Sequence, residues 1–134
     1  MSAEIRSIHF ATSDGVRLRI LEAVPSGSSG AVAVSGPVVA LVPGWSMPAR
    51  IWRPQLAALG ARWRVAALDP RGQGESEVPA GGFDIERRAA DVHEFIGRYQ
   101  HAVLVGWSLG ALEALQCVHR YGEASLEALV LVDS

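Results

Sequence analysis

The first part of the chain alternates apolar and polar positions. Residues 16–20 read V-R-L-R-I, so the apolar side chains would share one face of an extended strand. Asp14-Gly15, just before them, is a hairpin turn signal, and residues 5–10 supply the other arm. The pattern therefore predicts an antiparallel β-hairpin near the start of the chain.

From residue 38 onward, short and almost entirely apolar runs replace the alternation. Such runs are typical of strands buried on both faces of a parallel sheet, and they lie at residues 38–42, 64–68, 102–105 and 129–132. Helix-forming segments separate them at residues 49–59, 85–99 and 109–121. Asp84 can cap the second helix, whose apolar side chains recur every three or four positions at Ile85, Ala89, Val92, Ile96 and Tyr99. Alternating strands and helices predict an α/β fold with a mostly parallel sheet and an antiparallel hairpin at its edge.

A segment rich in turn formers separates the hairpin from this α/β pattern. It begins as P-S-G-S-S-G at residues 25–30 and extends to Gly36-Pro37. Because only the first 24 residues precede it, a surface loop between the second and third strands is favoured over a linker between domains. The 134 residues suit one domain with a single hydrophobic core.

The pentapeptide G-W-S-L-G at residues 106–110 contains the strongest chemical signal. It has the form G-x-S-x-G and lies between a predicted buried strand and a predicted helix, the setting in which this pattern marks a nucleophile. Gly106 and Gly110 would prevent collisions in a sharp, strained turn that lifts Ser108 above the sheet. The helix dipole and free amides there favour negative charge. We therefore expect Ser108 to be a nucleophile rather than an idle serine in a glycine-bounded turn.

A second loop offers the other half of an oxyanion site. Acyl transfer needs two amide donors directed at the oxyanion. The N–H of Leu109, directly after Ser108, is one, and we expect the N–H of Trp45, in the loop after residues 38–42, to be the other. Gly44 would let the backbone approach closely there. Pro43-Gly44 could instead form an ordinary turn at the end of a strand. The G-x-S-x-G turn at residues 106–110 (the elbow) makes that interpretation weaker.

A third loop, D-P-R-G-Q-G-E-S at residues 69–76, follows the second buried strand. Its G-x-G could suggest dinucleotide binding, but Glu77 stands where the third glycine should be and no helix begins at once. We interpret it as a tight loop at the rim of the sheet.

These three segments together resemble the α/β-hydrolase superfamily from about residue 5 to the last residue. The resemblance is greatest to small carboxylesterases such as the carrier-protein methyl esterase of biotin synthesis, with cofactor-free haloperoxidases and perhydrolases nearby. It implies cleavage of a small ester or thioester through an acyl-enzyme on Ser108, with Trp45 and Leu109 as backbone donors and with no cofactor or metal.

One departure from the family concerns the oxyanion loop. The family usually has His-Gly where this chain has Pro43-Gly44, so hydrogen bonds that brace the loop must come from elsewhere. Some cofactor-independent oxygenases of this fold share Pro-Gly-Trp, which keeps oxidative chemistry as an alternative.

A serine nucleophile also needs a base and an acid, and the resemblance places both after it in the chain. The histidine after Ser108 is His119, which about eleven helical residues at ~1.5 Å each would place roughly 16 Å away. His101 would lie roughly 20 Å off at ~3.3 Å per strand residue, at the other edge of the sheet. We interpret both, together with His9 and His93, as structural or surface residues.

Asp133 follows the last apolar run, at the expected catalytic edge, and is a candidate for the acid. A solvent-facing aspartate at a strand end is the favoured interpretation. Residues 128–132 are apolar throughout, which predicts a strand covered on both faces and flanked by neighbours.

The resemblance therefore predicts that residues 1–134 are the N-terminal portion of a single α/β-hydrolase domain, a fragment or the ordered part of a longer chain. Further strands and helices, a cap region, the acid in most family members and the catalytic histidine are expected downstream, and the 134 residues alone are expected to be inactive. A non-catalytic binding module that has lost the histidine is the alternative.

Composition excludes several classes of partner and favours one cellular compartment. Twelve basic and fourteen acidic side chains give a net charge of −2, which offers no footprint for nucleic acid or an anionic membrane. The single Cys117 cannot form an internal disulfide and is interpreted as a core residue, not a second nucleophile. The N-terminus lacks the apolar core of a signal peptide, and no apolar run is long enough to span a membrane. We expect a cytoplasmic protein acting on a small molecule.

The tryptophans are less informative. Trp107 could line the pocket beside the nucleophile or pack in the core. Trp52, Leu56 and Trp63 are expected to pack the first helix on the sheet.

Overall fold

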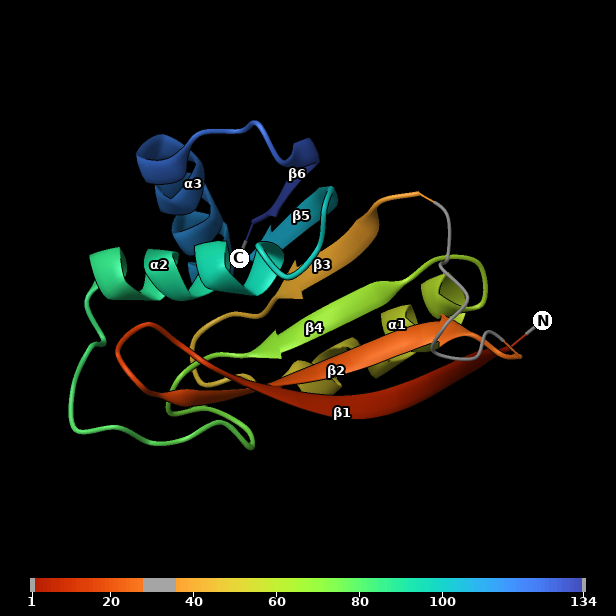
Figure 1. The fold of residues 1–134 in the computed structure, drawn as a ribbon, viewed down its shortest axis with the longest axis horizontal. Coiled ribbons are helices and arrows are strands. Elements are labelled where there is room, and N and C mark those ends of the chain that lie inside the picture. The colour runs from red at the N-terminus through yellow and green to blue at the C-terminus, as the bar shows by residue number, and fades with distance from the viewer. Residues whose placement is uncertain (1, 28–35, 134) are drawn as a thin grey trace.

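The computed structural model describes residues 2–27 and 36–133, so most of the predicted loop after the second strand lies outside the described residues. One mixed sheet has helices on both of its faces (Figure 1). Its elements are β1 (Ala3–Ala11), β2 (Arg17–Pro25), β3 (Val38–Val42), the 3-10 helix η1 (Ala49–Trp52), α1 (Arg53–Gly60), β4 (Val65–Asp69), α2 (Ile85–Ile96), β5 (Ala102–Trp107), α3 (Leu109–Tyr121) and β6 (Leu126–Val132).

The sheet has the strand order β1-β2-β4-β3-β5-β6. β1 pairs antiparallel with β2, and β2 pairs antiparallel with β4. β4, β3, β5 and β6 are parallel to one another. This arrangement confirms the prediction of a mostly parallel sheet with an antiparallel hairpin at one edge.

The chain reverses its direction of travel across the sheet at β3. It passes from β3 through α1 to β4 on one side, then through α2 to β5 on the other side. In open α/β sheets, ligands bind at such a point, outside the carboxyl ends of the two diverging strands. Here those ends belong to β3 and β5, which are followed by the two loops that the sequence singles out.

Alternate residues of the central strands contribute side chains to two hydrophobic cores, one on each face of the sheet. Ala66 and Leu68 of β4 face the core beneath α2 and α3, whereas Val65 and Ala67 face the core beneath α1.

The second helix begins where its cap predicts. The carboxylate of Asp84 accepts a hydrogen bond from the N–H of Arg87 at 2.9 Å. Two of the predicted apolar positions do not belong to the buried face, because Ile85 is exposed and Tyr99 lies after the end of α2.

The segment predicted as a helix over 49–59 is split into η1 and α1. Pro54, which has no N–H, lies in the first turn of α1, where a helix leaves that donor unused. Trp52 and Leu56 are buried in the core as predicted. Trp63 follows α1 and is 42% exposed, so the prediction that it packs the first helix on the sheet is wrong.

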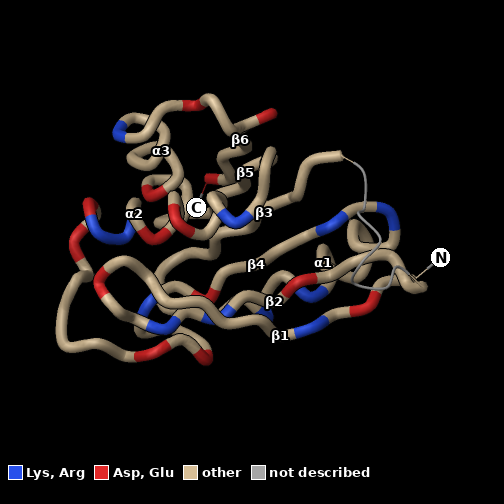
Figure 2. Tube along the Cα trace, viewed as in Figure 1, with Lys and Arg blue, Asp and Glu red and all other residues tan. Residues whose placement is uncertain are grey.

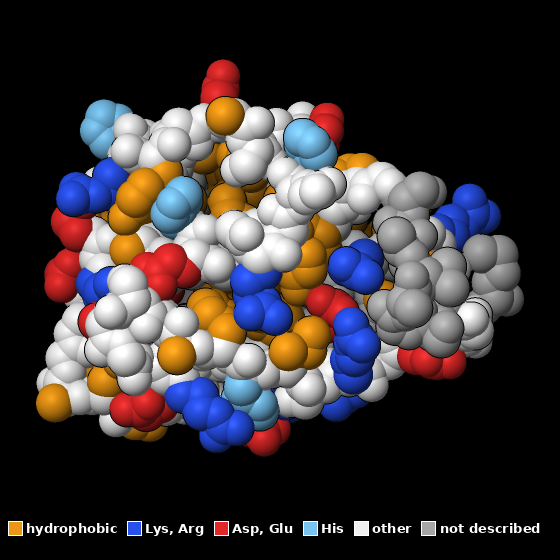
Figure 3. Space-filling view, viewed as in Figure 1, with side chains coloured by type: hydrophobic (Ala, Val, Ile, Leu, Met, Phe, Trp, Pro, Cys, Tyr) orange, Lys and Arg blue, Asp and Glu red, His pale blue; other side chains and the backbone are white. Residues whose placement is uncertain are grey.

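β6 is the outermost strand on the side away from the hairpin. Its residues Val130, Leu131 and Val132 are 40–44% exposed. Leu112 and Leu115 of α3 are also exposed, by 58% and 45%. The expected cover on both faces of this strand is therefore not found within residues 2–27 and 36–133. In the space-filling view, apolar side chains show between the polar ones near α3 and β6 (Figure 3).

Two glycines allow α3 to lie directly against the sheet. A Cβ atom on Gly106 would lie 2.4 Å from the carbonyl oxygen of Gly110, and one on Gly110 would lie 2.5 Å from that of Val42. These oxygens belong to the backbone and cannot swing aside. The close packing of α3 on β5 and β3 therefore requires glycine at both positions.

Charged residues of both signs are interleaved along the chain (Figure 2). Several of their side chains form ion pairs in the interior. Arg71, which is almost fully buried, donates to Asp91 of α2 at 2.6 Å and to Asp14 of the β1–β2 turn at 3.0 Å. The hydrogen bond from Arg71, together with one from Thr12, holds the pKa of Asp14 well below its usual range. This cluster ties the hairpin turn to α2.

The pKa of Asp14 makes the stability contribution of this cluster dependent on pH. Because the folded-state pKa is lowered, the Asp14 carboxylate stabilises the fold above its unfolded pKa of about 3.9, and this contribution is lost as the pH falls below that value. We expect Asp14→Asn to reduce the free energy of unfolding at pH 6, and the difference from wild type to shrink as the pH is lowered toward 2. Urea denaturation across this range measures it; a difference that does not change with pH would contradict the expectation.

The contact of α3 with the sheet can be tested at Gly110. We expect Gly110→Ala to destabilise the protein by about 1–3 kcal/mol or more, because the added methyl group must displace backbone atoms. Gly81→Ala is the matched control, since a Cβ atom there meets nothing within 4 Å. The control should change the free energy of unfolding by less than about 0.5 kcal/mol. Equal effects of the two substitutions in denaturant unfolding would show that the contact between Gly110 and the backbone of β3 leaves room for a methyl group.

Candidate active site

Ser108 joins β5 to α3 in an uncommon backbone conformation, with φ 58° and ψ −120°. Ser46 and Ser108 are the non-glycine residues with positive φ in the part of the chain that the structure describes. The surrounding structure holds the strained turn in place, because the N–H of Ser108 donates to Val132 at 3.0 Å and its carbonyl accepts from Ala111 at 2.9 Å. The Ser108 hydroxyl does not cap α3, so it stays available for chemistry.

The loop after β3 lies directly against this serine. A Cβ atom on Gly44 would lie 3.1 Å from the Cβ of Ser108 and 3.3 Å from the carbonyl oxygen of Trp107. The N–H of Trp45 donates no hydrogen bond to any residue in 2–27 or 36–133. Leu109 is the first residue of α3, where an N–H has no acceptor within the helix. Two amide donors without a backbone partner in the described residues therefore lie near Ser108: Trp45 follows Gly44, which packs against Ser108, and Leu109 follows Ser108 in the chain.

Gln73 and Asp69 brace the loop after β3, which contains Pro43-Gly44. The side-chain amide of Gln73 donates to the carbonyl oxygens of Gly44 at 3.3 Å and Met47 at 2.7 Å. The carboxylate of Asp69 accepts from the N–H of Ala49 at 2.6 Å. Sequence reasoning missed these roles; the available signal was that residues 69–76 follow β4, the strand beside β3.

Asp69 is fully buried and also fixes the conformation of its own loop. It accepts from Arg19 of β2 at 2.7 Å and from the N–H of Glu75 at 3.0 Å. A Cβ atom on Gly74 would lie 2.0 Å from a carboxylate oxygen of Asp69. The second glycine of G-x-G therefore makes room for this aspartate, which agrees with the interpretation of a tight loop.

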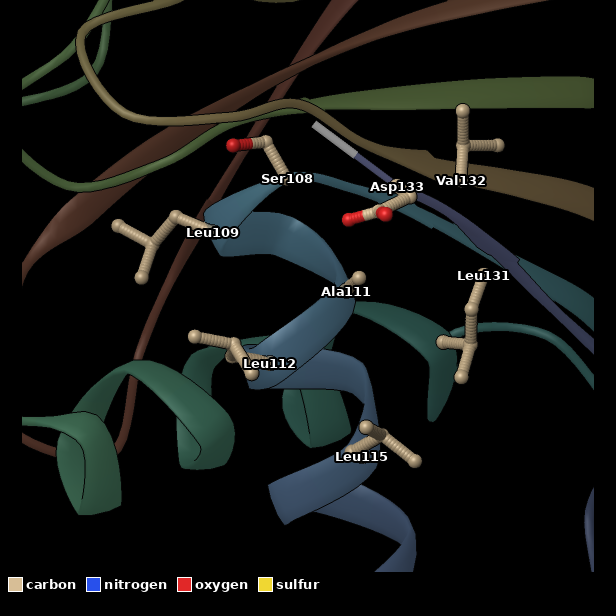
Figure 4. Close-up of a pocket in the computed structure, with 8 residues that line it drawn as sticks. All are labelled: Ser108, Leu109, Ala111, Leu112, Leu115, Leu131, Val132 and Asp133. Carbon is tan, nitrogen blue, oxygen red and sulfur yellow. The ribbon is translucent and has the colours of Figure 1, made fainter.

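An open pocket of about 510 Å³ borders Ser108 along the outer side of α3. Its walls are mostly apolar and come from α3 and the end of β6; they are formed by Leu109, Ala111, Leu112, Leu115, Leu131 and Val132 (Figure 4). The polar groups, Ser108 and Asp133, lie together near one end.

Asp133 follows β6 and lines the same pocket as Ser108, with its carboxylate directed toward α3 (Figure 4). No histidine in the described residues lines this pocket. His93 stacks on Tyr121 with ring centroids 3.9 Å apart, and His101 is exposed near Glu127. His9 and His119 are also exposed, so all four histidines have surroundings expected of structural or surface residues.

The side chains of two further residues pack in the hydrophobic cores and do not line the pocket beside Ser108. Trp107 packs against the core beneath α1, with its ring centroid 6.0 Å from that of Trp52 in an edge-on arrangement. This placement favours core packing over a role in lining the pocket. Cys117 is buried in the other core, and burial raises the pKa of its thiol to about 11. The thiol therefore stays protonated and is a poor nucleophile at neutral pH.

The described part of the chain lacks two other structural features. It contains no group of three or more His, Cys, Asp or Glu side chains that could hold a metal ion. None of its helices is long and apolar enough to cross a membrane.

Several known proteins share this sequence pattern. The chain is 34% identical over 101 residues to a Synechocystis protein named as a candidate non-heme chloroperoxidase, a match that covers 73% of this chain and 37% of that protein. It is 35% identical over 100 residues to a candidate carbamate hydrolase RutD of Escherichia coli, covering 72% of this chain and 37% of the relative. The chain thus spans well under half the length of these relatives.

Solved structures share the fold. An alpha/beta hydrolase from Novosphingobium aromaticivorans aligns with a TM-score of 0.82 and 24% identity, over 96% of this chain and 44% of that one. An esterase from Exiguobacterium antarcticum aligns with a TM-score of 0.75 and 26% identity, over 92% of this chain and 43% of the esterase.

A family model places these likenesses in one group. The model described as the alpha/beta hydrolase family matches residues 39–134, which include the loop after β3, the loop after β4 and the serine elbow. The sequence expectation is confirmed at this level: the chain belongs to the alpha/beta hydrolase family.

Proposed function

We propose that the full-length protein is a serine hydrolase that cleaves a small ester or thioester through an acyl-enzyme on Ser108. The proposal rests chiefly on one observation: Ser108 has a strained backbone, and it packs against Gly44, which precedes Trp45, and directly precedes Leu109 at the start of α3. A strained turn that needs two close-packed glycines is costly to maintain, and such strain concentrates at functional sites.

The chemistry follows from this arrangement. The oxygen of Ser108 attacks the carbonyl carbon while a general base takes its proton, and the negative charge on the carbonyl oxygen is stabilised by the two N–H groups. The C–O or C–S bond then breaks, and the base returns the proton to the leaving alcohol or thiol. Water, activated by the same base, attacks the acyl-enzyme and restores Ser108.

A histidine is proposed as the general base because of the family resemblance. In this fold the acid and the histidine follow the serine along the chain. We propose that residues 1–134 form the N-terminal portion of the hydrolase domain, with the histidine in the remainder of the full-length protein. Asp133 is the candidate acid in this chain, because its carboxylate lies in the same pocket as Ser108.

The esterase from Exiguobacterium antarcticum, which shares the fold, supports ester cleavage as the reaction. The apolar side chains of α3 and β6 near Ser108 are exposed, and the remainder of the domain is expected to cover β6, so they are not assigned to the substrate.

Ser108→Ala tests the nucleophile directly. In the full-length protein, a fluorophosphonate should label the wild type at Ser108, and Ser108→Ala should abolish labelling and reduce ester hydrolysis by at least about 10³-fold. Ser125→Ala, which changes an exposed serine, is the control and should retain both. Intact-protein and peptide mass spectrometry locate the label. An unlabelled wild type that still hydrolyses esters would exclude Ser108 as the nucleophile, and a full-length protein with neither property would favour a non-catalytic binding module.

Cofactor-independent oxidative chemistry is the second candidate. It is favoured by the Pro43-Gly44-Trp45 loop and by the relative named as a candidate non-heme chloroperoxidase. Oxygen uptake with an enolisable aromatic substrate, or peroxide-dependent halogenation, separates it from ester cleavage. We expect ester turnover to exceed both in the full-length protein, and the reverse ranking would favour the oxidative function.

A further inference from the structure

The side chain of Gln73 holds both ends of one short turn. Its Nε2 donates to the carbonyl oxygen of Gly44 at 3.3 Å and to that of Met47 at 2.7 Å. The turn is closed by a hydrogen bond from the N–H of Met47 to Gly44 at 3.2 Å, and it contains Trp45 and the positive-φ residue Ser46. The direction of the Trp45 N–H therefore depends on a turn that one side-chain amide clamps.

Arg88 of α2 fixes which end of the Gln73 amide faces this turn. A guanidinium can only donate hydrogen bonds, and Nη2 of Arg88 lies 3.2 Å from Oε1 of Gln73. The amide oxygen of Gln73 therefore accepts from Arg88, and the NH₂ group faces the carbonyl oxygens of Gly44 and Met47. A reversed amide would set the NH₂ group against Arg88 and an oxygen against two carbonyls.

Arg88 is itself held by Glu113 and lies beside Trp45. Its Nε donates to the carboxylate of Glu113 on α3, five residues after the nucleophile, and both side chains are at least 95% buried. The guanidinium carbon lies 5.8 Å from the centre of the Trp45 ring. The contacts thus link the nucleophile helix, α2 and the loop after β3.

This buried pair is not explained by stability alone. Removing two charges from water costs several kcal/mol per ion, and apolar side chains of similar size often serve a core equally well. Within the described residues, Nη1 of Arg88 also has no hydrogen-bond partner. A buried guanidinium with one unpaired nitrogen is better explained by what its other nitrogens hold in place.

We propose that Gln73, Arg88 and Glu113 are positioning residues for the oxyanion hole: the Arg88–Glu113 pair orients the Gln73 amide, which clamps the Gly44–Met47 turn and directs the Trp45 N–H. This inference rests on the proposed function, because the Trp45 N–H has a catalytic role only if Ser108 forms an acyl-enzyme. None of the three side chains lines the pocket that borders Ser108. Their effect is on the transition state, in which the oxyanion develops.

Substitutions at Gln73 separate the clamp from the ion pair. Gln73→Met removes the side-chain hydrogen bonds of this residue at similar size, whereas Gln73→Glu keeps an acceptor for Arg88 but cannot donate to Gly44 or Met47. We expect both variants of the full-length protein to reduce kcat about 10- to 100-fold, with KM changed less than about threefold, since losing an oxyanion donor costs about 10²–10³-fold.

Two further variants complete the set. The double variant Arg88→Met with Glu113→Met removes the pair without leaving one charge buried alone, and it should lower kcat in the same direction. Gln116→Met is the matched control, because Gln116 also joins α3 to α2, through Glu86, but touches neither the turn nor Gln73. It should leave kcat and KM unchanged.

A second measurement reports on the turn without depending on catalysis. Hydrogen–deuterium exchange of peptides covering residues 44–49 should be faster in Gln73→Met and Gln73→Glu than in wild type and Gln116→Met. Unchanged exchange overturns the proposal, as does faster exchange with unchanged kcat, and a wild-type kcat in Gln73→Glu overturns the clamp. If the wild type is not labelled at Ser108, the proposed function fails separately; faster exchange then still supports the clamp on the turn, and unchanged exchange overturns it.

Discussion

The backbone contact between the start of α3 and the carboxyl ends of β5 and β3 is the constraint on which the site depends. Gly106 meets Gly110, and Gly110 meets Val42, at distances that admit no side chain. With the helix so close to the strands, the chain must turn within one residue, and Ser108 takes a positive φ. The strain at Ser108 and the need for glycine at positions 106 and 110 thus have the same cause.

Polar groups, rather than apolar packing, fix the loops around that turn. Asp69 is fully buried and binds β2, the loop after β3 and its own loop, while Gln73 clamps the Gly44–Met47 turn. Loops at the end of a sheet expose backbone groups that need partners, and buried side chains with fixed hydrogen bonds supply them. Such a network sets loop positions more narrowly than apolar contacts do, because hydrogen bonds are directional.

Much of the fold could be predicted because local patterns and tertiary packing agree. The bounds of α3 and the cap of α2 follow from residues within one turn of each helix end. Trp63 could not be placed, because the turn after α1 directs it outward, and this depends on how the helix meets the sheet. The exposure of β6 was missed for a similar reason: an apolar run indicates a strand but does not identify its neighbours.

By itself the sequence determined the place of the serine turn, since a serine between two glycines, after a buried strand and before a helix, marks a sharp strand-to-helix connection. It also determined the family to which the chain belongs. Only the tertiary structure decided which side chains brace the loop after β3. Gln73, Arg88 and Glu113 come from three separate segments, and no local spacing relates them. Their association arises because β3 and β4 are neighbours in the sheet and α2 and α3 pack on the same face.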